Sequence, residues 1–338
     1  MRPSSARLLH TSVRVSDLTF PASGILVPRT RAIFIHVDNL ISFAKRDRDG
    51  RVDGYLVGYL PEEVVLLFFR KGELINAASI GPHGRTITSV AEGLRRLKSD
   101  PERSECCYAE ASQEQLNWMF AACAEPAKLR FVDSRQPEQV FPALASENFS
   151  GVLELISQGR VNYLKFEAGR FARGYLCDRP AGGSVVKYME SLFALRSDGS
   201  PPAIAGSLLP EQGDIPAQAH GTLVKVSREL FNRISLAIVD ELPADGRRKG
   251  ERASAAVQAV HPVFTVLTAA TTEDEPSTPI SADALTASFA DWTSRVLQEV
   301  ELVSPGSAER LIRDATRDQR FVLQAAGFYE KLPWQIVW

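Results

Sequence analysis

The pattern of hydrophobic and polar positions predicts strands in the first part of the chain and helices in the last part. Gly54 to Leu60 and Val64 to Phe69 are rich in β-branched and aromatic residues, which is typical of strands. Pro61-Glu62-Glu63 forms the turn between them, and Leu74 to Ser79 continues as a third strand. Together these segments predict an antiparallel meander.

The same pattern returns 97 residues later, and this predicts a duplicated module. The first copy reads Gly54-Tyr55-Leu56 and then Phe69-Arg70-Lys71-Gly72-Glu73-Leu74. The second copy reads Gly151-Val152-Leu153 and then Phe166-Glu167-Ala168-Gly169-Arg170-Phe171. Self-similarity at a fixed spacing is the signature of repeated structural units. Gly72 and Gly169 are expected in tight turns between strands, where glycine adopts a positive φ without steric cost.

Each copy should end in a helix, because apolar residues recur there at three- and four-residue spacing. In the first copy these residues are Ile87, Val90, Ala91, Leu94 and Leu97. In the second copy they are Val185, Val186, Met189, Leu192 and Phe193. Between the copies, Ser112 to Ala124 predicts another helix, and Ser112 with Gln115 fits a capping box.

The last third of the chain predicts a helical bundle. Leu223 to Leu242, Arg252 to Ala269 and the segments that begin at Ser281 and Ser307 carry apolar residues at helical spacing. Pro262 should break the second of these helices. Before this region, residues 201–220 contain several prolines and glycines, which predicts an extended linker.

These elements predict an α+β protein. Two repeated modules, each an antiparallel β-meander plus a helix, are followed by an α-helical C-terminal domain. The expected divisions are a disordered or extended N-terminus at 1–28, a first module at 29–125, a second module at 126–200, a linker at 201–220, and a helical domain with an aromatic C-terminal tail at 221–338.

Composition narrows the classes of function. A length of 338 residues suits two or three domains. The net charge of −2 argues against a protein that binds nucleic acid by neutralising phosphates. No apolar run approaches the roughly 18 residues that span a bilayer, so no membrane span is expected. The cysteines lack Cys-x-x-Cys spacing and fit small buried residues in a reducing compartment; they are Cys106, Cys107, Cys123 and Cys177.

The N-terminus allows two interpretations. Its first sixteen residues contain Arg2, Arg7, Arg14 and several serines but no acidic residue. This composition is typical of an organellar transit peptide. A disordered basic segment explains it equally well, and a cytoplasmic location is expected.

Motifs for catalysis are absent from the sequence. The chain has no Gly-x-x-x-x-Gly-Lys-Ser/Thr phosphate loop, no Gly-x-Ser-x-Gly nucleophile elbow and no His-Glu-x-x-His metal-binding helix. Its five histidines are far apart in the sequence. We therefore expect no enzymatic activity, no cofactor and no metal site.

Two segments are candidates for binding. Gly182-Gly183-Ser184 precedes a predicted helix and lies near Arg179, and the first copy has Arg85 after Gly84. Since helix N-termini attract anions, Arg85, Arg179, Gly183 and Ser184 predict a repeated anion-binding turn. The alternative is a strand-to-helix connection with an N-cap.

The second candidate is the C-terminal tail, which contains Trp334, Ile336 and Trp338. Aromatic anchors dominate many protein interfaces, so the tail is a candidate for partner binding or self-association. The alternative is that it docks onto the protein's own core.

The repeats also resemble a known family. Each is similar to the bacterial PATAN-type module and its allied uncharacterised domains, over residues 30–110 and 140–200. These modules have an apolar hairpin, then a Phe-x-x-Gly-x-Ile/Leu-x-x-Ala line, then a helix. The first copy supplies Phe69, Gly72, Leu74 and Ala77. The second has Phe166 and Gly169 but Phe171 in place of the aliphatic residue and Gly174 in place of alanine. The C-terminal third lies outside the resemblance.

The resemblance implies a non-catalytic, protein-binding role in bacterial signal transduction. The leading hypothesis is a regulator or scaffold whose helical C-terminal region binds a protein partner or self-associates as a homodimer. Two alternatives stay open at this stage. The chain could be a structural subunit of a larger bacterial or viral assembly, because a repeated fold suits a building block. It could also be a sensor of a small ligand or anion with a site between the modules.

Overall fold

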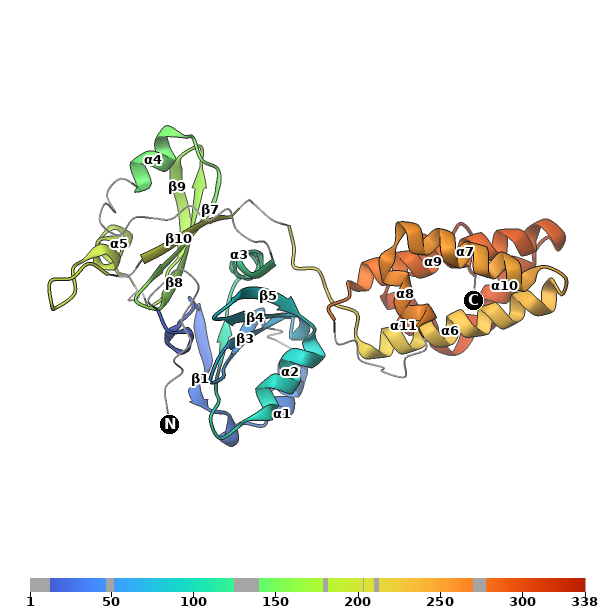
Figure 1. Cartoon of the computed structure of the whole chain (residues 1–338), viewed down its shortest axis with the longest axis horizontal. Coiled ribbons are helices and arrows are strands. Elements are labelled where there is room, and N and C mark those ends of the chain that lie inside the picture. Colours follow the sequence, from blue (N-terminus) through green and yellow to red (C-terminus); the bar gives the residue numbers. More distant parts are fainter. Residues whose placement is uncertain are drawn as a thin grey trace. The chain divides into compact units, whose positions relative to one another are not determined.

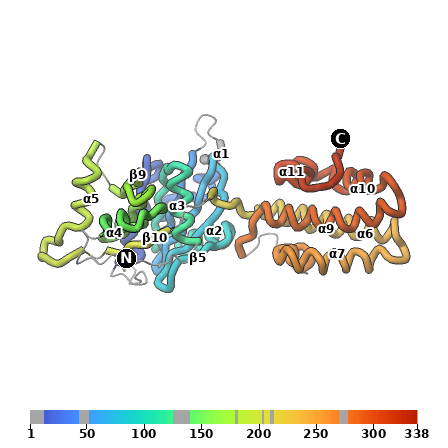
Figure 2. The backbone as a smooth tube through the Cα atoms, turned by 90° about the horizontal axis from the view of Figure 1, so that it is seen from above, coloured from blue at the N-terminus to red at the C-terminus, as the bar shows by residue number. Residues whose placement is uncertain are grey.

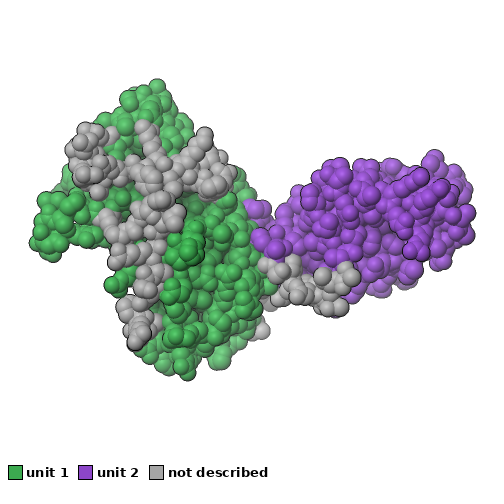
Figure 3. Space-filling view, viewed as in Figure 1, with its two compact units in different colours: residues 1–215 green, residues 216–338 purple. Residues whose placement is uncertain are grey.

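The computed structural model describes residues 13–46, 52–124, 140–178, 182–202, 204–209, 213–269 and 278–337. The chain divides into two compact units, residues 1–215 and residues 216–338 (Figure 1, Figure 3). The first unit contains both sheets and the second is helical. This confirms the predicted α+β class and the helical C-terminal region.

The first unit contains a six-stranded antiparallel sheet in the order β1-β6-β2-β3-β4-β5. Its strands are β1 (Gly24–Arg31), β2 (Gly54–Tyr59), β3 (Val64–Arg70), β4 (Glu73–Gly81), β5 (Gly84–Thr88) and β6 (Glu105–Glu110). The central strands β2 and β3 are buried along nearly their whole length, which explains their almost continuous apolar sequences. The predicted meander is β2, β3 and β4.

A second antiparallel sheet has four strands in the order β10-β7-β8-β9. They are β7 (Gly151–Ser157), β8 (Arg160–Glu167), β9 (Arg170–Tyr175) and β10 (Ile204–Leu209). The order β6-β2-β3-β4 in the first sheet matches this arrangement. Gly54 pairs with Phe69 as Gly151 pairs with Phe166, and both sheets have a register shift just before that phenylalanine, where it pairs with the next strand. The duplication is therefore present in the backbone pairing.

Gly72 and Gly169 occupy the same turn in the two copies, with φ of 75° in each. The residues before them, Lys71 and Ala168, are also left-handed, with φ of 49° and 47°. Two successive positive φ values are typical of the type I′ turn that closes tight hairpins. The amides before the glycines donate to equivalent side chains, Lys71 N to Asp53 Oδ1 at 2.6 Å and Ala168 N to Ser150 Oγ at 2.9 Å. The structural role predicted for both glycines is confirmed.

One apolar core joins the two sheets. Helix α3 (Gln113–Ala124) packs against β4 and β5 of the first sheet and β10 of the second, as Figure 1 shows. Its buried side chains lie on nearly all sides, since it contacts apolar surface in several directions. Tyr55 and Phe68 from the first sheet share this core with Val152 and Tyr163 from the second. The modules predicted at 29–125 and 126–200 therefore form one compact unit.

Helices cover the outer faces of the sheets. On the first sheet, α1 (Val37–Arg46) and α2 (Val90–Ser99) enclose one apolar cluster. On the second sheet, α4 (Val140–Ser146) and α5 (Val185–Phe193) enclose another. The layers of the first unit therefore follow the order helices, sheet, shared core, sheet, helices.

The second unit is built around α6 (Gly221–Glu241), α7 (Gly246–Val260) and α9 (Ala282–Val303), which pack side by side (Figure 2). Shorter helices complete it, namely α8 (Thr265–Thr268), α10 (Ser307–Thr316) and α11 (Arg320–Ala325). Pro262 interrupts the path between α7 and α8, as predicted. Ser281 caps α9, because its hydroxyl accepts from Ala284 N at 3.3 Å. No helix in the described part of the chain is both long enough and apolar enough to span a membrane.

The structure corrects three expectations about the first unit. Residues 204–209 of the predicted linker are strand β10, because they supply the hydrogen-bonding partner for the edge of β7. Within the N-terminal segment predicted as disordered or extended, Val15 and Leu18 are fully buried and β1 begins at Gly24; residues 1–12 lie outside the described part. The helix expected from Ile87 begins only at Val90, since Gly84–Thr88 is strand β5.

Candidate functional site

In the first copy, the residue expected to bind an anion is Arg85, and it forms an ion pair within the chain. Arg85 lies on β5 and its guanidinium bonds the carboxylate of Glu154 on β7, with Nη1–Oε2 of 2.7 Å and Nη2–Oε1 of 2.6 Å. Arg85 Nη1 also donates to the carbonyl of Ala122 at 3.1 Å. The prediction of Arg85 as an anion ligand is corrected, because a carboxylate of the same chain already neutralises it.

At the start of α5, Ser184 acts as an N-cap, and its hydroxyl accepts from Lys187 N at 3.4 Å. Its equivalent in the first copy is Ser89, which accepts from Glu92 N at 3.1 Å. The turn at Gly84 belongs to the β4–β5 hairpin instead. Gly183 lies in the connection before Ser184, and Arg179 lies outside the described residues. The structure therefore supports the alternative of a capped strand-to-helix connection at this position.

The ion pair of Arg85 and Glu154 is buried between the two sheets. The side chain of Glu154 is 2% exposed and that of Arg85 is 20% exposed. Burial by itself would lower the pKa of Arg85, but the charge and hydrogen bonds of Glu154 raise it above its ordinary value. Sequence reasoning missed Glu154, although a lone carboxylate inside the apolar run Val152-Leu153-Glu154-Leu155-Ile156 is a usable signal.

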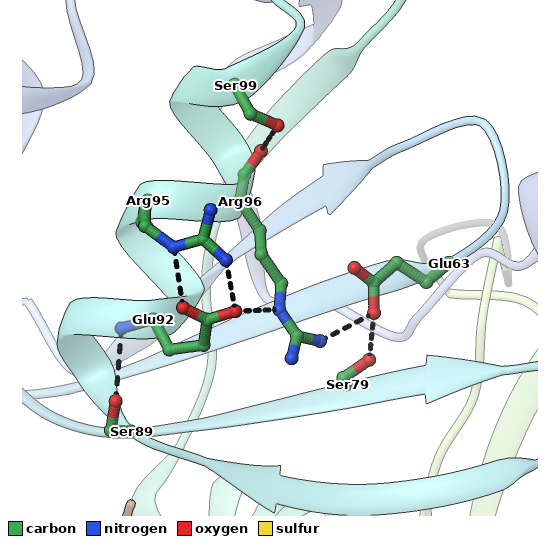
Figure 4. A network of polar contacts seen from close by, with 7 residues as sticks. All are labelled: Glu63, Ser79, Ser89, Glu92, Arg95, Arg96 and Ser99. Carbon is green, nitrogen blue, oxygen red and sulfur yellow. Dashed lines mark hydrogen bonds and ion pairs between the residues drawn. The ribbon is translucent and has the colours of Figure 1, made fainter. Parts of the chain in front are cut away.

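A polar network lies on α2 and the adjoining strands (Figure 4). Glu92 accepts from Arg95 and Arg96, and Arg96 Nη1 also reaches Glu63 Oε2 at 2.9 Å, where Ser79 donates as well. The hydrogen bonds from Arg95 and Arg96 lower the pKa of Glu92 to about 2. Because carboxylates of this network already bond both arginines, it holds α2 on the sheet and is a poor site for an anionic ligand.

Next to this network is a polar cleft of about 680 Å³. Its lining includes Glu62, Glu63, His83 and Asp100. Within the residues that the structure describes, no group of three or more His, Cys, Asp or Glu side chains has an arrangement that holds a metal ion. The described carboxylates that line the cleft therefore do not come together as ligands of one metal ion.

An apolar groove on the outer face of the second sheet is the strongest candidate for a binding site. It has a volume of about 550 Å³, within the roughly 300–1,000 Å³ range of ligand sites. It lies between α5, α4 and strands β8 and β9, and its lining is Phe141, Leu164, Phe171, Val185, Val186, Met189, Glu190, Phe193 and Ala194. Phe171 is 46% exposed and Val186 is 65% exposed. Exposed apolar side chains gathered in one groove are typical of an interaction surface.

Sequence reasoning placed Val186 on the buried face of its helix, and that assignment is wrong. Val185 and Val186 are adjacent on α5, so a helix cannot direct both toward the sheet. Val186 instead lines the rim of the groove. The sequence signal for its exposure was that Val186 is one apolar residue more than the helical periodicity needs.

The C-terminal tail packs on the helical unit. Leu332 is buried, and the half-buried Trp334 and Ile336 contact the core of the second unit. Trp338 lies outside the described residues. For Trp334 and Ile336 the packing favours the alternative in which the tail docks on the protein's own core.

No protein-family model matches the chain, and no curated protein or solved structure is significantly similar to it. The resemblance to PATAN-type modules therefore stays a prediction from the sequence.

Proposed function

We propose that this protein is a non-catalytic regulator or scaffold that acts by binding another protein, in bacterial signal transduction as the PATAN-type resemblance implies. The observation that carries the proposal is the open apolar groove on the second sheet. Of the nine described residues that line it, only Glu190 is charged, so the groove favours an apolar surface over a small polar substrate.

The exposure of the groove supports a macromolecular partner. Val186 and Phe171 are large apolar side chains that remain in water until another surface covers them. Covering such side chains contributes roughly 25 cal/mol for each Å² of apolar surface removed from water. A partner that buries both residues gains affinity from that burial, with the groove as the centre of the interface.

The test compares two valine substitutions in the full chain. Val186→Asp puts a charge in the groove, whereas Val260→Asp changes a valine of similar exposure, 64%, at the end of α7. Affinity capture from the source cells followed by quantitative mass spectrometry should find a protein retained by the wild type and by Val260→Asp and lost with Val186→Asp. Purified partner and purified chain should then form the same complex.

Unchanged circular dichroism and melting temperature of both variants would establish that the fold is intact. If the two variants retain the same proteins in the same amounts, the groove is not the binding surface and the proposal fails.

A further inference from the structure

The duplicated fold contains its own comparison for the groove, because the equivalent face of the first sheet is covered. There, Val37, Leu40 and Ile41 of α1 join the apolar cluster formed by α2 and the outer face of the sheet. α1 packs against β4, and Asp38 Oδ1 bonds Lys98 Nζ of α2 at 2.6 Å. An amphipathic helix therefore fills the space beside the second helix of the module.

Four of the residues that line the groove are equivalent to residues in that covered cluster. Counting from the matched strands, Leu164 and Phe171 correspond to Leu67 and Leu74. Counting from the capping serines, Val185 and Met189 correspond to Val90 and Leu94. Leu74, Val90 and Leu94 all pack in the cluster that contains α1. The groove is thus equivalent to an apolar surface that a helix covers in the first module.

In the second module the covering helix is shorter. α4 precedes β7 as α1 precedes β2, but α4 has 7 residues where α1 has 10. Among the groove residues, α4 contributes only Phe141, which packs edge-on against Phe193 at a centroid distance of 6.1 Å. Phe171 keeps nearly half of its surface exposed as a result.

One substitution between the copies keeps the groove wide. Gly93 lets α2 approach the first sheet, since a Cβ there would lie 3.1 Å from Leu67 Cδ2 and 3.3 Å from Ala77 Cβ. The equivalent residue of α5 is Tyr188, because Gly93 N and Tyr188 N each bond the carbonyl of the capping serine. The phenol of Tyr188 is buried, and its hydroxyl reaches Asn162 Oδ1 at 3.1 Å and the carbonyl of Cys177. Figures 1 and 2 both show α5 projecting from the second sheet.

The rim of the groove carries a negative charge. Glu190 is exposed, and the described residues include no ion-pair partner for it. In the first module the helix of the sheet supplies a cation, Lys98, and α1 supplies the acid Asp38. Aligned on the capping serines, Lys98 corresponds to Phe193 and Glu190 to Arg95, so the second module has no direct counterpart of that ion pair. The exposed carboxylate of Glu190 itself favours a lysine or arginine on the complementary helix.

From these observations we propose that the groove binds one amphipathic helix of a partner protein, with apolar residues at i, i+3 or i+4 and i+7 and a basic residue opposite Glu190. This inference rests on the proposed function and adds the class of partner segment. Helix-in-groove recognition uses the same anchor spacing. Three turns of helix suffice to place three anchors along the groove.

The probe is a displayed library of peptides patterned on α1. Each peptide has about fourteen residues, because shorter isolated helices are marginal in water. The apolar positions equivalent to Val37, Leu40 and Ile41 are kept apolar and the polar positions are randomised. Selection uses the full chain, and fluorescence anisotropy then measures the affinity of individual peptides.

Selected peptides should be helical when bound and enriched in lysine or arginine at one position. Val186→Asp should weaken them by about tenfold or more, because it places a charge against an apolar face. Glu190→Lys should weaken them about two- to fivefold, as expected for an exposed ion pair. Val260→Asp should leave the affinity unchanged.

Several results would overturn the inference. One is the absence of any library peptide that depends on Val186; another is a self-associated chain that Val186→Asp dissociates, which would assign the groove to a second copy. A third is binding that appears only after residues 125–139 are replaced by a glycine-serine linker. A natural partner whose binding requires Val186 but which presents an extended segment would contradict the inference of a helical ligand. The proposed function, protein binding through the groove, would still hold.

Discussion

Arg85 and Glu154 join the two sheets of the first unit through a bidentate ion pair, with both guanidinium–carboxylate distances below 3 Å. Arg85 comes from β5, a strand that has no counterpart among the described strands of the second sheet. The ion pair therefore joins the two repeats through a strand that is not part of the repeated pattern. It helps to fix how one copy packs on the other.

Removing one member of this pair should destabilise the first unit. Glu154→Gln leaves the Arg85 charge between the sheets without its counter-charge, at an expected cost of about 3 kcal/mol in the free energy of unfolding. The double change Arg85→Met with Glu154→Leu should recover part of that loss, since no buried charge remains. Native-state hydrogen exchange of β2 and β3 measures both effects.

The matched control for the ion pair is Arg103→Met. Arg103 bonds Asp100 at 2.7 Å, but its side chain is 73% exposed. Its loss should change the free energy of unfolding by less than about 0.5–1 kcal/mol. An equally small effect of Glu154→Gln would contradict the structural role given to the buried pair.

The turn at Gly169 allows backbone strain and steric contact to be separated. Gly169→Ala should be more destabilising than Gly199→Ala, although φ is +75° and +78° at the two positions. A Cβ at Gly169 would lie 2.7 Å from Ala145 Cα, whereas a Cβ at Gly199 meets nothing within 4 Å. Both substitutions carry the cost of a left-handed residue, about 1 kcal/mol, and only Gly169→Ala should add a further loss of roughly 1–3 kcal/mol. Thermal unfolding of the two variants tests the difference, and equal melting temperatures would be incompatible with the packing of α4 on this turn.

The cysteine thiols should react slowly in the folded protein. Burial raises the pKa of Cys123 and Cys177 to about 12 and that of Cys106 to about 11. Since the thiolate is the reactive form, titration with a disulfide reagent at pH 8 should label at most the half-buried Cys107 quickly. All 4 cysteines should react after unfolding in guanidinium. A fast phase that persists in Cys107→Ser would show that one of the buried thiols is accessible.

The network around Glu92 should make a pH-dependent contribution to stability. Hydrogen bonds from Arg95 and Arg96 lower the pKa of Glu92 in the folded protein from about 4.5 to about 2. The folded protein therefore holds this carboxylate ionised more strongly than the unfolded chain, so the stabilisation is complete above about pH 4.5 and is lost as the pH falls toward 2. Because the ion pairs are near the surface, they contribute about 0.5–1 kcal/mol to the free energy of unfolding.

Glu92→Gln tests this contribution by urea unfolding at pH 7, 5 and 3. The variant should be less stable than the wild type at pH 7 and the gap should narrow at pH 3. Added salt should reduce the gap at pH 7 as well. A difference that stays constant from pH 7 to pH 3 would mean that the charge of Glu92 is not the source of its effect.

The candidate site was only partly predictable from the sequence. Ser184 was identifiable as a helix cap because a cap depends on the residues that immediately follow it. Val186 was misplaced, since helical periodicity identifies an apolar residue without identifying the surface that covers it. The width of the groove depends on Tyr188 standing where the first copy has Gly93, and that comparison requires the two helices to be aligned on their capping serines.

The sequence by itself determined the local elements of this protein. The repeated meander, the turns at Gly72 and Gly169, the break at Pro262 and the cap at Ser281 all follow from residues close together in the chain. Their conformations depend on φ preferences, neighbouring hydrogen bonds and periodicity, which are local properties.

The tertiary structure decided which of these elements meet. It turned part of the expected linker into β10, because Ile204–Leu209 pairs with β7. It gave Arg85 the carboxylate of Glu154, 69 residues away, and merged two predicted modules into one core. Such choices depend on which distant surfaces bury each other and which distant backbone groups pair, and neither residue type nor spacing along one strand or helix contains that information.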